Sequence, residues 1–199
     1  MTTDWLARFR RYGAVQEGHF LLSSGLHSGV YVQAALILQH PDEAEALGCA
    51  LADLVRPLHP DLAIGPALGA VIVAHEVARA LRVRALFAER ADGRLALRRG
   101  FAVAPGERAL IVEDVITTGG STAEVAALVR EAGGVVAGVA ALVDRTGGRR
   151  AFDAPLQALL TLDLPAFPAG ACPLCRAGVP TTKPGSRPGA GVGNPNNPP

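Results

Sequence analysis

The segment from Ala109 to Thr122 combines an apolar run, two adjacent carboxylates and a turn rich in threonine and glycine. Glu113 and Asp114 end the apolar run, and the turn Thr117-Thr-Gly-Gly-Ser121 follows before a helical pattern begins. Free amides and the positive end of the helix dipole make the start of a helix favourable for an anion. The carboxylates would repel that anion unless they face hydroxyl groups, which need acceptors. The pattern therefore predicts a sugar-phosphate site, with phosphate on the turn and ribose hydroxyls on the carboxylates.

The order of these residues separates the segment from other phosphate-binding motifs. In dinucleotide sites the acidic residue that holds the ribose follows the glycine loop, whereas here both acids precede it. The turn contains no lysine, which excludes a Walker A loop. The structural alternative is an ordinary strand, turn and helix with a Ser or Thr cap. Two acids directly before the turn are hard to explain by packing alone.

Composition limits the partners of the chain. Its 199 residues carry 19 Lys+Arg and 18 Asp+Glu, a formal net charge of +1, so no global basic field recruits nucleic acid. No apolar run approaches the roughly 20 residues that span a bilayer, and the first residues lack the features of a signal peptide. We therefore expect a cytoplasmic protein that binds neither nucleic acid nor membrane.

Short apolar runs alternate with helical patterns from Asp61 onward. The runs are almost continuously apolar, as in parallel strands that helices cover on both faces. The sequence therefore predicts a doubly wound α/β core. The expected strands include residues 62–64, 85–87, 109–112 and 135–143, and the expected helices between them are 70–81 and 121–132.

The flanking segments are expected to form a lid over one end of the sheet. Residues 4–12 and 41–55 are expected to be helices, and residues 20–33 two short strands around Ser24-Gly25. We expect one domain over residues 1–182, with a core at about 41–149 and a hood from about 13–40 and 150–182. Residues 183–199 are almost wholly Pro, Gly, Asn, Ser and Arg, which predicts a disordered tail.

Val112 to Thr122 resembles the phosphoribosyl pyrophosphate signature of the type I phosphoribosyltransferases. Residues 18–31, 142–146 and 172–187 resemble orotate phosphoribosyltransferases, and the likeness extends from about Gly13 to Arg187. The resemblance implies a doubly wound parallel sheet with a small hood built from the N- and C-terminal segments. It also implies transfer of ribose 5-phosphate from phosphoribosyl pyrophosphate to orotate in pyrimidine biosynthesis, with Mg²⁺ as cofactor and a homodimer as the assembly.

The same resemblance assigns residues to each substrate. Arg145 follows the expected strand 135–143, and its guanidinium can hold a carboxylate, which orotate carries, through two parallel hydrogen bonds. In the family the matching arginine binds orotate, and Thr117 contacts it too. A solvated surface arginine is the alternative. The residues assigned to phosphoribosyl pyrophosphate are Glu113, Asp114, Val115, Ile116, Thr117, Thr118, Gly119, Gly120 and Ser121.

Two further loops complete the implied site. The loop from Ile64 to Ala70 matches the family's loop near pyrophosphate, in which a strained or cis peptide is expected, and it has Gly69 where many relatives have lysine. Residues 88–100 predict a hairpin that turns at Asp92-Gly93. Arg90 is the candidate for contact with pyrophosphate and joins Glu113 and Asp114 as a catalytic residue. The other arginines of the hairpin, which can equally form a solvated face, are Arg94, Arg98 and Arg99.

Two positions remain open. Ser23 replaces a basic ligand-contacting residue of many relatives, so its share of binding passes elsewhere or is lost. Cys172 and Cys175 supply only half of a tetrahedral zinc site, with no second Cys pair or paired His nearby in sequence. A twofold dimer can supply the other half, but we favour packing or a reversible redox pair. Cys49, inside an expected helix, is expected to be a small buried hydrophobic residue.

Two other functions compete with orotate transfer. The first is another type I phosphoribosyltransferase, for a purine or for uracil. The second is a non-catalytic regulator that keeps the nucleotide site and binds RNA or a protein partner, although the near-zero net charge speaks against RNA.

Overall fold

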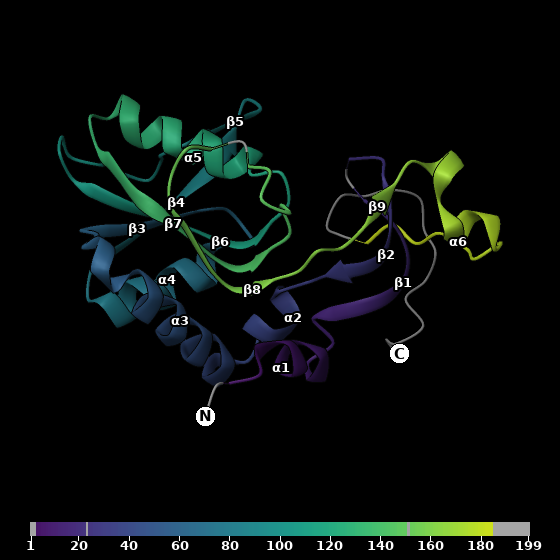
Figure 1. Cartoon of the computed structure of the whole chain (residues 1–199). Coiled ribbons are helices and arrows are strands. Elements are labelled where there is room, and N and C mark those ends of the chain that lie inside the picture. Colours follow the sequence, from purple (N-terminus) through teal and green to yellow (C-terminus); the bar gives the residue numbers. More distant parts are fainter. Residues whose placement is uncertain (1–2, 23, 151, 185–199) are drawn as a thin grey trace. The chain divides into compact units, whose positions relative to one another are not determined.

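The computed structural model describes residues 3–22, 24–150 and 152–184. The chain divides into two compact units (Figure 1). The larger contains Met1–Ala14 and Ala34–Asp163, and the smaller contains Val15–Gln33 and Leu164–Pro199. Ser23 and all but the first two residues of the expected disordered tail 183–199 lie outside the described residues.

The larger unit is built on a six-stranded sheet with the order β5-β4-β3-β6-β7-β8. All neighbouring strands run parallel except β5, which pairs antiparallel with β4. The central position of β6 places its carboxyl end between those of two parallel neighbours. The strands are β3 (Leu62–Pro66), β4 (Arg84–Ala91), β5 (Arg94–Ala96), β6 (Arg108–Ile116), β7 (Val135–Asp144) and β8 (Leu156–Thr161).

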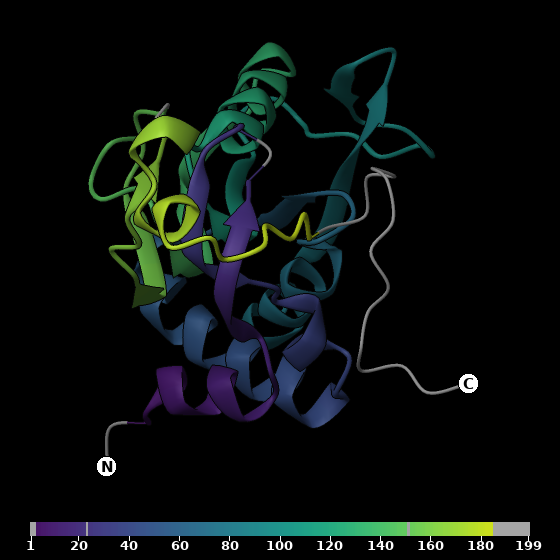
Figure 2. The same ribbon diagram turned by 90° about the vertical axis from the view of Figure 1, so that its right-hand side faces the viewer.

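Helices cover both faces of this sheet. Figures 1 and 2 show α3 (Pro41–Val55) and α4 (Val71–Leu81) on one face and α5 (Gly120–Glu131) on the other. Pro41 begins α3 at its first turn, where a missing amide hydrogen costs no hydrogen bond. Buried residues then recur at helical spacing along α3, at Ala44, Leu47, Leu51, Ala52 and Val55. Shorter helices are α1 (Trp5–Arg11), α2 (Ala35–Leu38) and η1 (Arg56–Leu58).

The core of the larger unit confirms the predicted α/β class. Fully buried Ile64, Ile111 and Val139 from three parallel strands pack in one cluster with Val125 and Val129 of α5. Every strand and helix expected from the alternating apolar runs is present, although the strands are longer than the runs that predicted them. Continuous apolar runs mark the buried middle of a parallel strand, while its ends are more exposed.

One segment expected in the hood belongs to the larger unit instead. β8 pairs parallel with β7, from Val139 opposite Leu156 to Asp144 opposite Thr161. Residues 34–40 also group with the larger unit. In this division the smaller unit takes residues 15–33 and 164–199, whereas the hood was expected from about 13–40 and 150–182; at the second boundary the difference arises because β8 extends the large sheet by one strand.

The smaller unit contains a three-stranded antiparallel sheet with the order β1-β2-β9. Strands β1 (Val15–Leu21) and β2 (His27–Val32) form the hairpin that the sequence predicts around Ser24-Gly25. Strand β9 (Ala166–Phe167) pairs with β2. The chain then forms η2 (Ala169–Ala171) and α6 (Pro173–Arg176) and returns to β1, where the amide of Thr182 donates to the carbonyl of His19 at 2.7 Å.

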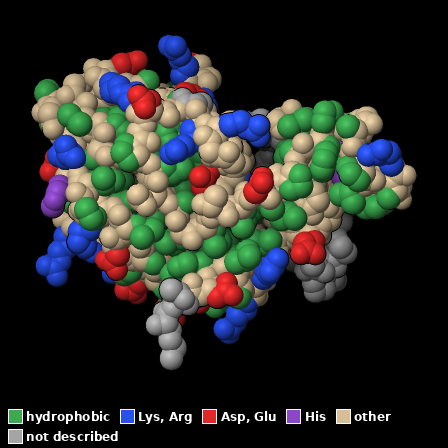
Figure 3. All heavy atoms as spheres, viewed as in Figure 1, with side chains coloured by type: hydrophobic (Ala, Val, Ile, Leu, Met, Phe, Trp, Pro, Cys, Tyr) green, Lys and Arg blue, Asp and Glu red, His purple; other side chains and the backbone are tan. Residues whose placement is uncertain are grey.

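On the face drawn in Figure 3, acidic and basic side chains are interspersed among apolar and neutral ones. This mixture agrees with a net charge of +1. Among the residues that the structure describes, no helix is both long and apolar enough to cross a membrane.

A buried carboxylate attaches α1 to α3 and allows a test of the fold. Glu43 is 8% exposed and accepts hydrogen bonds from Arg8 at 3.1 Å and from the Tyr12 hydroxyl at 2.8 Å. The hydrogen bond from Arg8 lowers the pKa of Glu43. A lowered pKa stabilises the fold above the carboxyl's ordinary value, and this contribution is lost as the pH falls through the folded-state pKa.

We therefore expect Glu43→Gln to reduce the free energy of unfolding by about 1–3 kcal/mol at pH 7, since hydrogen bonds to charged groups contribute about that much. The deficit should shrink as the pH falls below 4. Urea unfolding of the variant and of the wild type at pH 7 and at pH 3 measures this difference. Glu45→Gln, at an exposed position on the same helix, is the matched control. Equal effects of the two substitutions at pH 7 would contradict the assignment.

Candidate active site

The turn between β6 and α5 leaves the start of the helix without a side-chain cap. Gly119 lies at the N-cap with φ of 81°, a left-handed conformation that glycine adopts without strain. Because glycine has no side chain, it supplies no capping oxygen to the first amides of α5. The residues assigned to the donor differ in exposure: Thr117, Thr118 and Gly120 are exposed, Val115 and Ser121 are half-buried, and Ile116 and Gly119 are buried.

Glu113 is a buried carboxyl group at the end of β6. Only 6% of the residue is exposed, and the hydroxyl of Thr122 donates to its Oε1 at 3.1 Å. Burial and the neighbouring charge of Asp114 raise the pKa of Glu113 to about 8, against the opposing hydrogen bond from Thr122. Without a ligand the group is therefore mainly protonated at pH 7. A bound cation or a ring with positive charge would favour its ionised form.

Asp114 lies against the loop that follows β3. Burial raises its pKa, while the backbone amide of Val115 opposes the rise. A Cβ atom built on Gly69 would lie 2.5 Å from Oδ2 of Asp114, so any side chain at position 69 would displace the carboxylate. With Gly69 where many relatives have lysine, the loop offers only its backbone at this position. As expected of the loop, it also contains a cis peptide bond, between Ala67 and Leu68.

Arg145 lies at the same edge of the sheet as the turn between β6 and α5. Its amide donates to the carbonyl of Ile116 at 2.8 Å, one residue before Thr117. The pairing of β6 with β7 sets this register, with Ile116 opposite Asp144. The carboxylate of Asp144 accepts a hydrogen bond from the amide of Thr146 at 2.8 Å and so stabilises the turn that follows the strand. Thr117 and Arg145, the two residues assigned to orotate, therefore directly follow the ends of the neighbouring strands β6 and β7.

The hairpin of β4 and β5 forms as the sequence predicts, with a two-residue turn at Asp92 and Gly93 in which both φ angles are positive. The two nitrogens of the Arg90 guanidinium donate to the two carboxylate oxygens of Glu124, each at 2.8 Å. This bidentate pair attaches the hairpin to α5. The guanidinium that we assigned to pyrophosphate is thus bound to Glu124 in this structure.

The remaining arginines of the hairpin differ in their partners. Arg99 pairs with Glu89 at 3.1 Å, and Arg98 lies 3.9 Å from the same carboxylate. Arg94 is exposed and has no ion-pair partner within 4.0 Å in the part of the chain that the structure describes. Arg94 is therefore the arginine of this hairpin most available to an anionic ligand.

Two side chains that contact the predicted site residues were not predicted from the sequence. Glu124 neutralises Arg90 from 34 residues away, and Thr122 contacts Glu113 across the turn. The available signal for the inward position of Thr122 was its helical spacing to the apolar residues Val125, Ala126 and Val129, which are buried with it in α5. Nothing local to Glu124 distinguishes it from a solvated helix residue.

The family model described as the phosphoribosyl transferase domain matches residues 33–172. The chain belongs to the phosphoribosyltransferase family. Relatives in this family include an orotate phosphoribosyltransferase of Pelotomaculum thermopropionicum, 52% identical over 94% of this chain and 99% of its own length. Another, from Thermotoga petrophila, is 50% identical over 88% of this chain and 94% of its own length.

Solved structures of phosphoribosyltransferases share the fold. An orotate phosphoribosyltransferase from Aeropyrum pernix superposes with a TM-score of 0.64 at 27% identity, over 78% of this chain and 92% of its own. A phosphoribosyltransferase from Corynebacterium diphtheriae gives a TM-score of 0.64 at 30% identity, over 80% of this chain and 95% of its own. These likenesses confirm the type I phosphoribosyltransferase fold expected from the sequence.

The raised pKa of Glu113 should make the stability of the fold depend on pH. A carboxyl whose folded-state pKa is about 8, against an ordinary 4.5, stabilises the fold fully below 4.5, and this contribution is lost as the pH rises through 8. Glu113→Gln does not titrate and loses nothing in that interval. The thermal midpoint of the variant minus that of the wild type should therefore increase by at least about 4 °C between pH 5 and pH 8.5. This increase corresponds to roughly 1–2 kcal/mol in the free energy of unfolding.

Thermal unfolding followed by circular dichroism, without ligands, makes this comparison. Glu131→Gln, an exposed position at the end of α5, is the matched control and should follow the wild type at both pH values. A Glu113→Gln curve parallel to that of the wild type would show that Glu113 is ionised in the folded protein.

Proposed function

We propose that this chain transfers ribose 5-phosphate from phosphoribosyl pyrophosphate to orotate, giving orotidine 5-phosphate and pyrophosphate in pyrimidine biosynthesis. The observation that carries the proposal is the pair of carboxylates, Glu113 and Asp114, at the end of β6 directly before the uncapped start of α5. The identity of about 50% to orotate phosphoribosyltransferases over most of their length supports the choice of base.

The donor fits the turn through three kinds of contact. The amides at the start of α5 and the exposed hydroxyls of Thr117 and Thr118 bind the 5-phosphate. Glu113 and Asp114 accept hydrogen bonds from the ribose hydroxyls. The backbone around Gly69, which lies against Asp114, faces the pyrophosphate.

The carboxylates also favour the bond cleavage. As pyrophosphate leaves, the ribose ring gains oxocarbenium character like that of glycoside cleavage. Burial makes an ionised Glu113 unfavourable in the empty site, and positive charge that develops on the ring reverses this preference. No side chain needs to act as a nucleophile, because the orotate nitrogen attacks the anomeric carbon directly.

Mg²⁺ is part of the proposal, and the residues present fit it. Mg²⁺ prefers oxygen ligands and usually binds substrate phosphates with one or two protein carboxylates, and Asp114 offers one at the position assigned to the ribose. When bound, the ion would stabilise the charge of the departing pyrophosphate. Glu113, with its pKa raised by burial, is the group whose ionisation a nearby cation would favour most.

Arg145 and Thr117 hold the acceptor in this proposal. A guanidinium binds the orotate carboxylate with two parallel hydrogen bonds, which fixes the orientation of the ring as well as its position. Since the amide of Arg145 donates to the carbonyl of Ile116, the acceptor is held next to the turn that binds the donor. Holding both substrates at neighbouring strand ends reduces the entropic cost of reaction.

The hairpin takes a divided role. The ion pair between Arg90 and Glu124 positions the hairpin. We assign contact with pyrophosphate to Arg94, and also to Arg90 when the ligand replaces Glu124 as its partner. A homodimer, in which this hairpin acts in its own or the neighbouring subunit, and a cytoplasmic location complete the proposal. Both rest on the family resemblance.

The test of the base is a spectrophotometric assay of orotate consumption with phosphoribosyl pyrophosphate and Mg²⁺. Orotate should be consumed, and uracil, adenine and hypoxanthine should neither replace it nor compete with it. Turnover of one of those bases without turnover of orotate would overturn the choice of acceptor while leaving the donor site intact.

Arg145→Ala should raise KM for orotate at least about tenfold, since loss of charged hydrogen bonds costs roughly 1.5–3 kcal/mol. KM for the donor should change less than about twofold. Arg145→Lys should rescue little, because an ammonium group lacks the planar fork. Arg149→Ala, at an exposed position of the same loop, is the control. Equal losses for both substrates would show that Arg145 does not read the carboxylate.

A further inference from the structure

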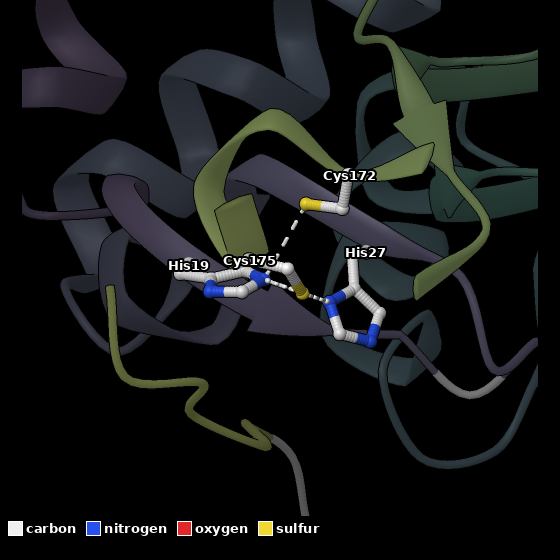
Figure 4. Close-up of side chains that lie close together, drawn as sticks. All are labelled: His19, His27, Cys172 and Cys175. Carbon is white, nitrogen blue, oxygen red and sulfur yellow. Dashed lines mark hydrogen bonds between the residues drawn. The ribbon is translucent and has the colours of Figure 1, made fainter. Parts of the chain in front are cut away.

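Four side chains with metal-binding atoms converge in the smaller unit. His19 lies on β1, His27 begins β2, Cys172 precedes α6 and Cys175 lies within it. One ligand atom from each lies within 4.8 Å of the others. Figure 4 shows the two imidazoles and the two thiols pointing toward one another. The histidines supply the half of a tetrahedral site that the Cys-x-x-Cys pair alone lacks, and they do so within one chain.

The separations suit a tetrahedral ion. Zinc bonds of about 2.3 Å to sulfur and 2.0–2.1 Å to nitrogen place neighbouring ligand atoms roughly 3.3–3.8 Å apart. Nε2 of His19 lies 3.5 Å from Sγ of Cys172 and 3.6 Å from Sγ of Cys175, and Nδ1 of His27 lies 3.2 Å from Sγ of Cys175. Nε2 of His19 and Nδ1 of His27 are closer, at 2.7 Å, so an ion between them would separate the rings slightly.

A neighbouring carbonyl selects the required tautomer of His19. Its Nδ1 lies 2.7 Å from the carbonyl oxygen of Val179, an acceptor only, so Nδ1 carries the hydrogen and donates it. Nε2 then presents its lone pair to the cluster. The amide of Val179 donates to the carbonyl of Leu174 at 3.0 Å, which holds the acceptor in place. Metal-bound histidines characteristically have such a partner on their other ring nitrogen.

Burial indicates a structural site. Cys172 is fully buried, His19 and His27 are 3% and 8% exposed, and Cys175 is half-buried. Four protein ligands leave no position for water or substrate, as in structural rather than catalytic zinc sites. Two sulfur and two nitrogen ligands in a tetrahedral arrangement select Zn²⁺ over Mg²⁺ or Ca²⁺.

A bound ion would stabilise the smaller unit, which buries few apolar side chains. In its described residues the buried hydrophobic side chains are those of Phe20, Val32 and Cys172. A unit with so few buried apolar groups gains little from the hydrophobic effect, and metal binding is a common substitute. The four ligands also come from two segments far apart in the sequence, the β1–β2 hairpin and the residues around α6.

We propose that His19 Nε2, His27 Nδ1 and the thiolates of Cys172 and Cys175 bind one structural Zn²⁺ that joins the β1–β2 hairpin to the α6 segment. Binding releases the thiol protons and changes no oxidation state. The site is separate from the proposed transfer reaction and does not depend on it.

The direct test is the zinc content of the full chain, purified without a histidine tag from zinc-supplemented medium and dialysed extensively. Mass spectrometry of the metal should find about one zinc per chain in the wild type and less than about one fifth of that in Cys172→Ser and His27→Ala. Cys49→Ser and His75→Ala, exposed positions on α3 and α4, are matched controls and should keep the full content. The expectation that Cys49 is buried was wrong, because its side chain lies on the solvent side of α3.

A second measurement uses the wild type alone, in case the ligand variants fail to fold. After removal of zinc by a chelator, addition of Co²⁺ should produce the visible bands of tetrahedral cobalt together with a thiolate charge-transfer band. A zinc-free wild type after supplementation, an unchanged zinc content in Cys172→Ser, or a Cys172–Cys175 disulfide in the freshly purified protein would each overturn the proposal.

Discussion

The burial of Glu113 beside the half-buried Asp114, at the carboxyl end of β6, is the constraint on which the rest of the site depends. Desolvation raises the pKa of Glu113 to about 8, so at pH 7 the empty site holds a mainly protonated carboxyl group whose ionised form a suitable ligand would stabilise. The fold provides that arrangement because β6 lies between β3 and β7. One neighbour brings the backbone of Gly69 against Asp114, and the other brings Arg145 beside the turn.

The two units of the chain are stabilised by different means. Parallel strands and the helices on both faces bury a continuous apolar core in the larger unit, which needs no further support. The smaller unit has a short antiparallel sheet and few buried apolar groups. Its four converging ligand atoms would allow a bound metal ion to stabilise it in place of a large apolar core. Zinc at His19, His27 and the Cys172–Cys175 pair would therefore affect the order of the smaller unit, and leave the large sheet unchanged.

The parts of the structure that local sequence determines were predictable. Apolar runs predicted the parallel strands, and Pro41 predicted the start of α3. Asp92-Gly93 predicted the hairpin turn, and the turn from Thr117 to Ser121 predicted the start of α5 to within one residue. Contacts between distant segments were not predictable. Glu124 pairs with Arg90 across 34 residues, and Cys172 meets His19 across 153, because tertiary packing rather than periodicity brings them together. The placement of β8 in the large sheet was missed for the same reason.

Binding of phosphoribosyl pyrophosphate to the β6 carboxylates is measured most directly by titration calorimetry with Mg²⁺ present. Glu113→Gln and Asp114→Asn should each weaken the donor at least about tenfold, since a hydrogen bond to a charged group contributes roughly 1.5–3 kcal/mol. Asp53→Asn, exposed on α3, should bind like the wild type. If both carboxylate variants bind the donor with wild-type affinity, the ribose does not lie on Glu113 and Asp114, and the site proposed for this turn is wrong.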